Sequence, residues 1–271
     1  PYRRQRQMCI RDSSMSGLAE ILLKEGFTVS GSDNKESALT DQLEKAGAKV
    51  FYKQQASNII DGIDVVVYTA AIHEDNEEYR AALDRGLPML SRAELLGQLM
   101  TNYQIPIAVS GTHGKTTTTS MLSHILLSAD LDPTISVGGI LKAIGGNIRV
   151  GNSEVFLTEA CEYTNSFLHF FPKISVILNI DEDHLDFFKD LDDIRHSFRC
   201  FAEKLDEKGV LIINGEIPNR TYFTENLPCK VITYGLDSSD TYTAKNITFD
   251  DHACGSYDLY ANGEKLEHMT P

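Results

Sequence analysis

The sequence has no tryptophan, few cysteines and no long apolar run. The five cysteines form no C-x-x-C pair and no metal-ligand spacing, which excludes a zinc-finger-like site and favours a reducing compartment. They are Cys9, Cys161, Cys200, Cys229 and Cys254. No stretch approaches the roughly 18 apolar residues of a membrane helix, and no signal-peptide pattern is visible. We therefore expect a soluble, cytoplasmic protein without a membrane partner.

Basic residues are also scarce. The chain has 25 Lys and Arg against 39 Asp and Glu, a net charge of −14. Nucleic-acid binding relies on cationic patches, so this balance argues against a nucleic-acid partner. Hydrophobic residues make up 42% of the 271 residues, which is enough for the cores of two domains.

Short apolar runs alternate with helical patterns along most of the chain. Such alternation predicts an α/β fold, with parallel sheets covered by helices on both faces. In the first hundred residues the predicted strands are 28–33, 49–52, 64–68 and 88–90. We place a domain boundary near 101–104, which divides a Rossmann-like domain over 1–103 from a P-loop ATPase-type α/β domain over 104–271.

Three other stretches lead to specific expectations. The first 13 residues, PYRRQRQMCIRDS, carry four arginines and no strand or helix period. We interpret them as non-native to the fold, poorly ordered, and leaving the first sheet without a strand there. Glycine pairs bracket residues 140–148, which predicts a flexible loop. Asn262-Gly263 predicts a type I′ hairpin near the C-terminal end.

The stretch SGTHGKTTTTSM, residues 110–121, organises the second domain. An apolar strand precedes it and a helical pattern follows it, so its backbone N–H groups and the helix N-terminus converge on one point, where they bind phosphate. Lys115 would reach the outer phosphates and the Thr116 hydroxyl would ligate Mg2+. The candidate nucleotide-binding residues are Gly111, Thr112, His113, Gly114, Lys115, Thr116 and Thr117.

The motif leaves an alternative open. In the general pattern G-x-x-x-x-G-K-[ST] the first glycine would fall on Val109, so the pattern is not fully met. A bare GK-[ST] also occurs in a glycine turn that opens an ordinary helix. The strand before and the helix after favour the phosphate loop.

Polar residues follow several predicted strands. Glu159 follows strand 155–158, where a phosphate-loop enzyme supplies a carboxylate to its metal, although a lone Glu could be a solvated loop residue. Glu162 is a weaker candidate. His184, within DEDHLD, is by spacing alone better explained as a surface histidine in an acidic turn. Asp33 ends the second predicted strand, where it would meet a ribose or cap the next helix.

The run THGKTTTT resembles the ATP loop of the Mur ligases, the amino-acid-adding enzymes of peptidoglycan synthesis. Further segments occur in the same order as in the alanine-adding members of that family, from residue 14 to about 234. They are SMSGLAEILL, SGSD, TAAI, SRAELL, GTHGKTTTTSML, EACEYTNSFL and NIDEDHLDFF. The resemblance implies an ATP-dependent ligase that phosphorylates the carboxylate of UDP-N-acetylmuramate and joins it to L-alanine.

The resemblance also implies roles for single residues. Lys115 would hold the outer phosphates, Thr116 and Glu159 one Mg2+, and His184 a second Mg2+, so that these residues form the catalytic and metal site. Asn179 and Asp183 would support the metal ligands. The UDP-sugar candidates in the first domain are Ser32, Asp33, Ala71 and Asn76.

Two departures qualify this resemblance. The family opens with an apolar strand and a glycine-rich loop where this chain has residues 1–13, and it has a third, amino-acid-binding domain after the central one. We therefore expect this chain to be a fragment that is inactive alone. Two alternatives remain open: a sibling ligase that adds another amino acid or a peptide, and a nucleotide-binding module without ligase activity.

Overall fold

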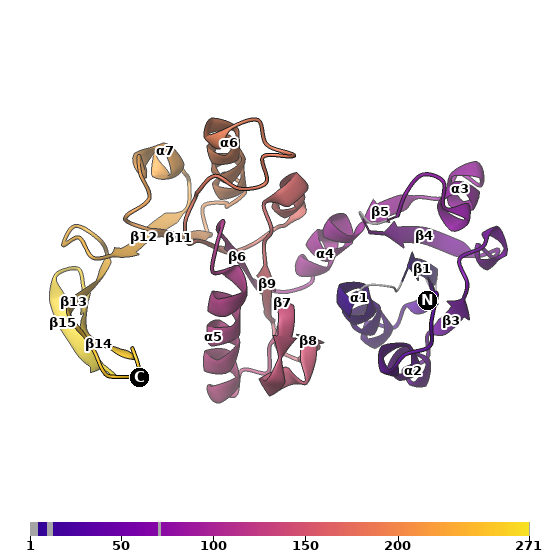
Figure 1. Ribbon diagram of the computed structural model, residues 1–271, viewed down its shortest axis with the longest axis horizontal. Coiled ribbons are helices and arrows are strands. Elements are labelled where there is room, and N and C mark those ends of the chain that lie inside the picture. Colours follow the sequence, from indigo (N-terminus) through magenta and orange to yellow (C-terminus); the bar gives the residue numbers. More distant parts are fainter. Residues whose placement is uncertain (1–4, 10–12, 70–71, 271) are drawn as a thin grey trace. The chain divides into compact units, whose positions relative to one another are not determined.

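The computed structural model describes residues 5–9, 13–69 and 72–270 (Figure 1). The chain divides into two compact units. One contains residues 1–103 and 120–157, and the other contains residues 104–119 and 158–271. No helix among the described residues is both long and apolar enough to cross a membrane.

The first sheet has five strands in the order β3-β2-β1-β4-β5, and every neighbouring pair is parallel. This parallel sheet with intervening helices confirms the predicted α/β class. Parallel strands require crossover connections, and the helical patterns between the strands provide them. The strands are β1 (Gln5–Cys9), β2 (Thr28–Asp33), β3 (Lys49–Tyr52), β4 (Ile63–Tyr68) and β5 (Met89–Ser91).

The expectation that the first sheet lacks a strand near the start of the chain is wrong. Gln5–Cys9 is β1, which pairs with β2 on one side and β4 on the other. An inner strand is held by backbone hydrogen bonds to both neighbours, which do not depend on a side-chain period. Arg6 in this strand is buried, with its guanidinium 5.2 Å from the centre of the Phe27 ring. Residues 1–4 and 10–12 lie outside the described part of the chain.

Local sequence signals explain where the helices of this unit begin. Ser37 and Ser91 each accept a hydrogen bond from the backbone N–H three residues on, in capping boxes, and Asn76 caps a third helix. Ser37, not Asp33, is therefore the cap of the helix after β2, so that alternative for Asp33 is wrong. The helices are α1 (Ser13–Lys24), α2 (Ala38–Lys45), η1 (Ala56–Asn58), α3 (Glu77–Asp84) and α4 (Arg92–Met100).

The second sheet has ten strands in the order β15-β14-β13-β12-β11-β10-β6-β9-β7-β8. Strands β6, β10, β11 and β12 are parallel, whereas β13 to β15 are antiparallel. The strands are β6 (Ile105–Ser110), β7 (Thr134–Leu141), β8 (Gly146–Arg149), β9 (Val155–Glu159), β10 (Ile174–Ile177), β11 (Val210–Asn214), β12 (Lys230–Gly235), β13 (Tyr242–Phe249), β14 (Gly255–Ala261) and β15 (Glu264–Met269).

Two turn predictions had different outcomes. The flexible loop expected over 140–148 is wrong, because β8 pairs antiparallel with β7 and a 3-10 turn, η2 (Lys142–Ile144), joins them. Ile148 on β8 also packs against α1, where a Cβ added to Gly17 would lie 2.0 Å from it. The hairpin at Asn262-Gly263 is confirmed, with φ of 50° and 85° as a type I′ turn requires.

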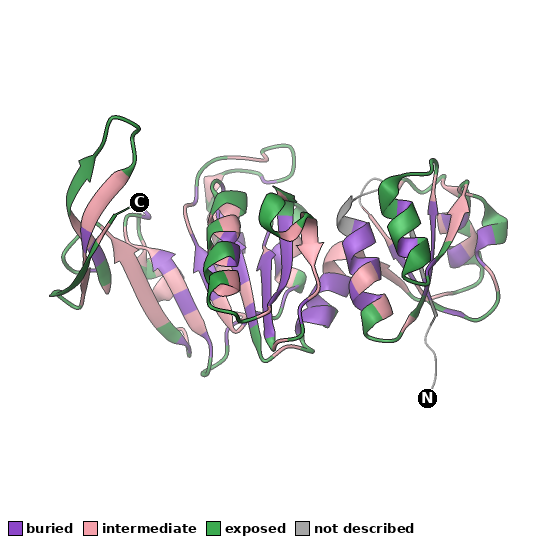
Figure 2. Cartoon of the chain, turned by 90° about the horizontal axis from the view of Figure 1, so that it is seen from below, coloured by how far each residue is buried: buried purple, intermediate pink, exposed green. Residues whose placement is uncertain are grey.

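Buried residues, purple in Figure 2, lie along strands and helices of both units, and aromatic side chains form much of the core in the second unit. Phe167 stacks on Phe201, with ring centres 4.6 Å apart, and meets Phe198 edge-on. All three rings have no exposed surface, and burying rings of this size provides a large part of the hydrophobic stabilisation. The helices after residue 104 are α5 (Lys115–Ser128), η3 (Tyr163–His169), α6 (Leu191–Ala202) and α7 (Thr221–Thr224).

Candidate functional site

The glycine loop, residues 110–116, connects β6 to α5. Gly111 has φ of 141° and Gly114 has φ of 82°, values that side-chain-bearing residues rarely adopt. A Cβ on Gly111 would lie 2.9 Å from the Leu178 Cβ. The loop therefore passes close to the end of β10, and only glycine fits at this point.

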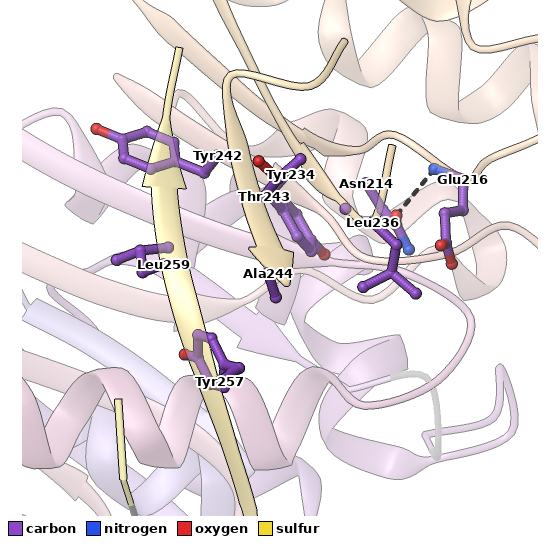
Figure 3. A pocket seen from close by; sticks show the side chains of 10 residues that line it. Asn214, Glu216, Tyr234, Leu236, Tyr242, Thr243, Ala244, Tyr257 and Leu259 are labelled. Atoms are coloured by element: carbon purple, nitrogen blue, oxygen red, sulfur yellow. Dashed lines mark hydrogen bonds between the residues drawn. The ribbon is translucent and has the colours of Figure 1, made fainter. Parts of the chain in front are cut away.

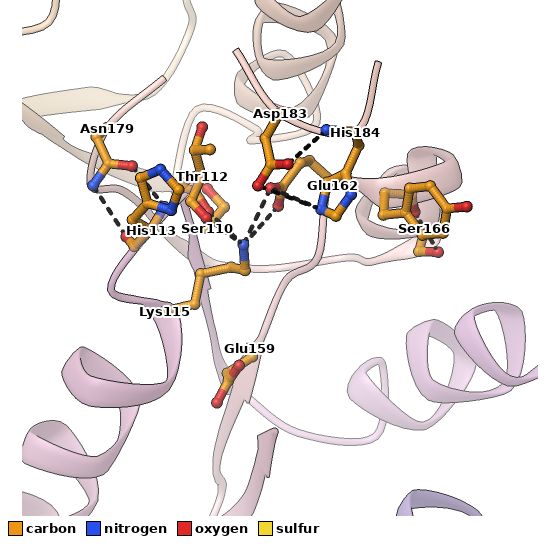
Figure 4. A network of polar contacts seen from close by, with 12 residues as sticks. Ser110, Thr112, His113, Lys115, Glu159, Glu162, Ser166, Asn179, Asp183 and His184 are labelled. Atoms are coloured by element: carbon orange, nitrogen blue, oxygen red, sulfur yellow. Dashed lines mark hydrogen bonds and ion pairs between the residues drawn. The ribbon is translucent and has the colours of Figure 1, made fainter. Parts of the chain in front are cut away.

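Asn179, in the segment just after β10, holds the glycine loop in place (Figure 4). Its Oδ1 accepts from the His113 N–H at 2.7 Å, and its Nδ2 donates to the His113 carbonyl at 3.0 Å. The Asn179 carbonyl also accepts from the Thr112 N–H at 3.2 Å. The structure thus places Asn179 against the backbone of the loop, and its support of the metal ligands stays a prediction.

Lys115 turns back onto its own loop. Its Nζ donates to the carbonyl oxygens of Gly111 at 2.6 Å and of Thr112 at 3.1 Å. It also forms an ion pair with Glu162, at 2.9 Å from Oε2 (Figure 4). The Glu162 side chain is only 2% exposed and that of Lys115 16%. Charge-assisted hydrogen bonds of this kind are among the stronger ones in a protein.

Thr116 and Glu159 lie together, as the metal prediction requires. The Thr116 hydroxyl donates to Glu159 Oε2 at 3.1 Å. A hydroxyl and a carboxylate are oxygen ligands of the type Mg2+ selects, and magnesium commonly binds through one or two protein groups together with phosphate oxygens. The chemistry of this pair therefore fits Mg2+.

His184 is brought to the same region by the segment after β10. Its Nε2 lies 4.0 Å from Glu162 Oε1 and 3.9 Å from Asp183 Oδ2. Its ring packs on Tyr163, with ring centres 4.6 Å apart, and its φ of 53° is unusual for a residue with a side chain. The described residues contain no group of three or more His, Cys, Asp or Glu arranged to hold a metal. The second-metal role of His184 stays a prediction.

Glu162 is the residue whose importance the sequence understated. Its only signal was a second acidic residue three positions after Glu159 in EACE. Its burial and its contacts to Lys115 and His184 appear only once β9, β10 and the glycine loop are brought together. The remaining loop candidates, His113 and Thr117, are exposed.

The UDP-sugar candidates lie at the carboxyl edge of the first sheet. The Ser32 hydroxyl is fully buried and donates to Glu78 Oε2 at 2.6 Å, so it faces the interior. Asp33 accepts from the Lys35 N–H at 3.2 Å. Asn76 caps α3 and donates to Gln54 Oε1 at 2.7 Å. Ala71 lies outside the described residues.

Glu78 is the centre of this buried network. Its Oε1 accepts from Asn58 Nδ2 at 2.5 Å while its Oε2 accepts from Ser32. Burial raises the pKa of the Glu78 carboxyl, although these hydrogen bonds lower it in part. One carboxylate therefore joins the end of β2 to η1 and α3.

A separate cavity of about 500 Å³ lies at the carboxyl ends of β11 and β12 (Figure 3). Its lining combines aromatic and aliphatic side chains with Asn214 and Glu216, and the Asn214 side chain accepts from the Glu216 N–H at 3.0 Å. None of the predicted site residues lines it. The aromatic part consists of Tyr234, Tyr242 and Tyr257.

Family models match both parts of the chain. The model described as "Mur ligase family, catalytic domain" matches residues 6–104. The model described as "Mur ligase middle domain" matches residues 109–270.

Two curated relatives of this chain carry the same name. The UDP-N-acetylmuramate–L-alanine ligase of Agathobacter rectalis is 62% identical over 253 residues, which is 93% of this chain and 55% of the relative. The protein of that name from Lachnospira eligens is 60% identical over 258 residues, 95% of this chain and 56% of the relative. This chain thus spans just over half the length of these relatives.

Two solved ligase structures are also similar to this chain. A ligase from Neisseria meningitides, named for joining UDP-N-acetylmuramate to L-alanyl-gamma-D-glutamyl-meso-diaminopimelate, matches with a TM-score of 0.84 and 27% identity, covering 100% of this chain and 87% of that one. UDP-N-acetylmuramate-alanine ligase from Thermotoga maritima matches with a TM-score of 0.79 and 27% identity, covering 99% and 60%. Because the middle-domain model alone spans more than half of the residues and carries the glycine loop, Glu159 and His184, the chain belongs to the Mur ligase family.

Proposed function

We propose that this chain is part of an ATP-dependent ligase that joins L-alanine to the carboxylate of UDP-N-acetylmuramate during peptidoglycan synthesis. The observation that carries the proposal is the glycine loop with Lys115, set beside the Thr116–Glu159 pair. The 62% identity to a protein named UDP-N-acetylmuramate–L-alanine ligase supports the choice of substrates.

The proposed reaction has two steps. A carboxylate is a poor electrophile, so one of its oxygens first attacks the γ-phosphorus of ATP and ADP leaves. The alanine amine then attacks the acyl carbon of the acyl phosphate, loses a proton, and inorganic phosphate leaves. Phosphoryl transfer depends on positioning and charge neutralisation, which suits a cationic lysine and a ring of backbone donors.

Magnesium is part of the proposal. Thr116 and Glu159 would hold one Mg2+, and His184 would hold a second. When bound, the metal neutralises charge on the phosphate oxygens. The oxygen ligands of the first pair support that site more strongly than the imidazole of His184 supports the other, because Mg2+ prefers oxygen.

The first domain, 1–103, would bind the UDP-sugar along the carboxyl edge of its parallel sheet, where ligands bind in open α/β sheets. Asp33 and Asn76 lie at that edge. The matches of the two family models, 6–104 and 109–270, support the boundary near 101–104. A cytoplasmic location is also proposed; the four cysteines that the structure describes are free thiols.

A peptide-adding sibling is the second candidate. The Neisseria structure, named for a peptide substrate, matches this fold at least as well as the alanine ligase from Thermotoga, at equal sequence identity. The fold therefore does not discriminate between the two substrates. Only the higher identity of the curated alanine ligases favours alanine.

The test places this chain in a full-length protein. The matching 253 residues of the Agathobacter rectalis relative are replaced by this chain, and phosphate release is measured with ATP, UDP-N-acetylmuramate and either L-alanine or the tripeptide. Alanine-dependent release is expected. Release that depends only on the tripeptide would establish the sibling activity instead.

Lys115→Ala in the same protein is expected to abolish phosphate release, because no other side chain of the glycine loop carries a fixed positive charge. The variant should still fold, although its thermal unfolding midpoint should fall because the buried Glu162 loses its ion partner. Wild-type turnover by Lys115→Ala would refute the assignment of the loop.

A further inference from the structure

The ammonium group of Lys115 has no donor to spare. A lysine side chain has three N–H donors. Three acceptors lie within hydrogen-bond distance of its Nζ: the carbonyls of Gly111 and Thr112 and the carboxylate of Glu162. An incoming phosphate can reach this ammonium only if one of the three contacts breaks.

The two carbonyl acceptors are fixed in the backbone of the loop. The Gly111 backbone is packed against the end of β10, and Thr112 is held by its hydrogen bond to Asn179. These carbonyls move only if the loop itself changes shape. The contact with Glu162 joins two side chains, so it can break by side-chain rotation with the backbone of the loop in place.

The charges also indicate that the contact between Lys115 and Glu162 is the one that breaks. A phosphate oxygen and the Glu162 carboxylate are both anionic, so they compete for one ammonium and repel each other when close. A buried carboxylate that loses its cation is costly, yet His184 Nε2 stands 4.0 Å from Glu162 Oε1. Glu162 therefore faces a second nitrogen when Lys115 turns away.

We propose that Glu162 is a positioning residue. It is the counter-ion of Lys115 in the free protein, and Lys115 leaves it to contact the outer phosphates when a nucleotide binds. The proposal rests on the proposed function, since it takes the glycine loop to be a polyphosphate site. Glu162 thus keeps Lys115 folded back against the loop in the free protein. It also opposes binding, because the ion pair must be broken.

The test uses the chain of 271 residues and metal-free tripolyphosphate with a chelator, so that metal ligation by Glu162 plays no part. Calorimetry compares wild type with Glu162→Gln, which keeps the shape and removes the charge. Glu207→Gln, an exposed carboxylate in the same unit, is the control for net charge. Removing a like charge about 5 Å from the anion is expected to tighten binding at least about tenfold, while Glu207→Gln changes it less than twofold.

The measured affinities either support or overturn the proposed exchange of Lys115 between Glu162 and phosphate. Unchanged or weaker binding by a folded Glu162→Gln overturns the exchange, because a purely structural or orienting role predicts loss. Lys115→Ala separates the two claims: if it leaves binding intact, the polyphosphate site itself is wrong. If Lys115→Ala abolishes binding and Glu162→Gln does not tighten it, only the exchange is wrong.

A measurement on wild type covers the case in which Glu162→Gln fails to fold. In a crystal structure with tripolyphosphate bound, Lys115 Nζ should lie more than about 4 Å from both Glu162 oxygens, beyond hydrogen-bond distance. A contact that remains at 2.9 Å with the anion in place overturns the proposal.

Discussion

At the residue scale, Glu78 connects stability to pH. Burial raises the pKa of its carboxyl above the usual 4.5, so the folded protein binds this proton more tightly than the unfolded chain does. The stabilisation from this group is present below pH 4.5 and is lost as pH rises through the folded-state pKa. Glu78→Gln should remove that dependence. The unfolding midpoints of wild type and variant are measured from pH 4 to 8. As pH rises, the midpoint of the variant should rise relative to that of wild type.

Glu77→Gln provides the matched control for this prediction. Glu77 is the exposed neighbour on the same helix. Its variant should follow the wild-type pH profile. A flat difference curve for Glu78→Gln, parallel to that of Glu77→Gln, would contradict the pKa argument.

Asn179 provides a second prediction for a single residue. Asn179→Ala removes both side-chain hydrogen bonds to the His113 backbone. Each such bond contributes about 1 kcal/mol, so metal-free tripolyphosphate should bind roughly tenfold more weakly as the loop loosens. Asn152→Ala, which loses a comparable bond to Asp132, is the control and should bind as wild type does. Equal affinities for the two variants would show that Asn179 does not hold the loop in shape.

At the element scale, β1 joins the two halves of the first sheet. β2 and β4 pair with β1 and not with each other, so the order β3-β2-β1-β4-β5 depends on five residues. Gln7→Pro removes a backbone N–H from this inner strand, and proline is essentially confined to edge strands and bulges. The free energy of unfolding should fall by more than the roughly 1 kcal/mol of one lost backbone hydrogen bond.

Gln7→Ala is the control because it keeps the backbone N–H. Denaturant unfolding of the two variants separates the role of the backbone from that of the side chain. If the proline variant is as stable as the alanine variant, β1 is not the inner strand of the sheet.

Elements with a strong local signal could be predicted from the sequence. Strand 28–33 and strand 49–52 were predicted with the bounds that the structure has, because they alternate with helical patterns in the local sequence. β1 and β8 could not be predicted in this way. β1 has no apolar pattern and forms through pairing on both sides, and β8 forms through pairing with β7 and packing on α1.

The candidate site likewise contains residues that the sequence could predict and residues that it could not. The motif and the strand ends indicated Lys115, Thr116 and Glu159, and the structure brings the last two into contact. Glu162 was ranked below Glu159, because ion pairing across strands leaves no mark in the local sequence. The loop contact of Asn179 was missed for the same reason.

At the scale of the whole molecule, the chain spans 55% of the length of the Agathobacter rectalis relative. Amide formation requires the amine within about 3–3.5 Å of the activated carbonyl in a site that excludes water. We therefore expect residues 1–271 alone to bind ATP weakly and to release no phosphate in response to alanine. Calorimetry and a phosphate assay on the same sample check both parts. Production of the alanyl nucleotide sugar by this chain would contradict the expectation.

The ion pair between Lys115 and Glu162 has a consequence for selectivity. Because the lysine already has a carboxylate partner, the loop offers little net charge to a passing anion, in a molecule of net charge −14. Chloride or acetate, with one negative charge, gains nothing over the carboxylate it would displace. A chain of phosphates gains more, because it concentrates several charges at the helix N-terminus. The loop thus discriminates by charge density before any base or sugar is recognised.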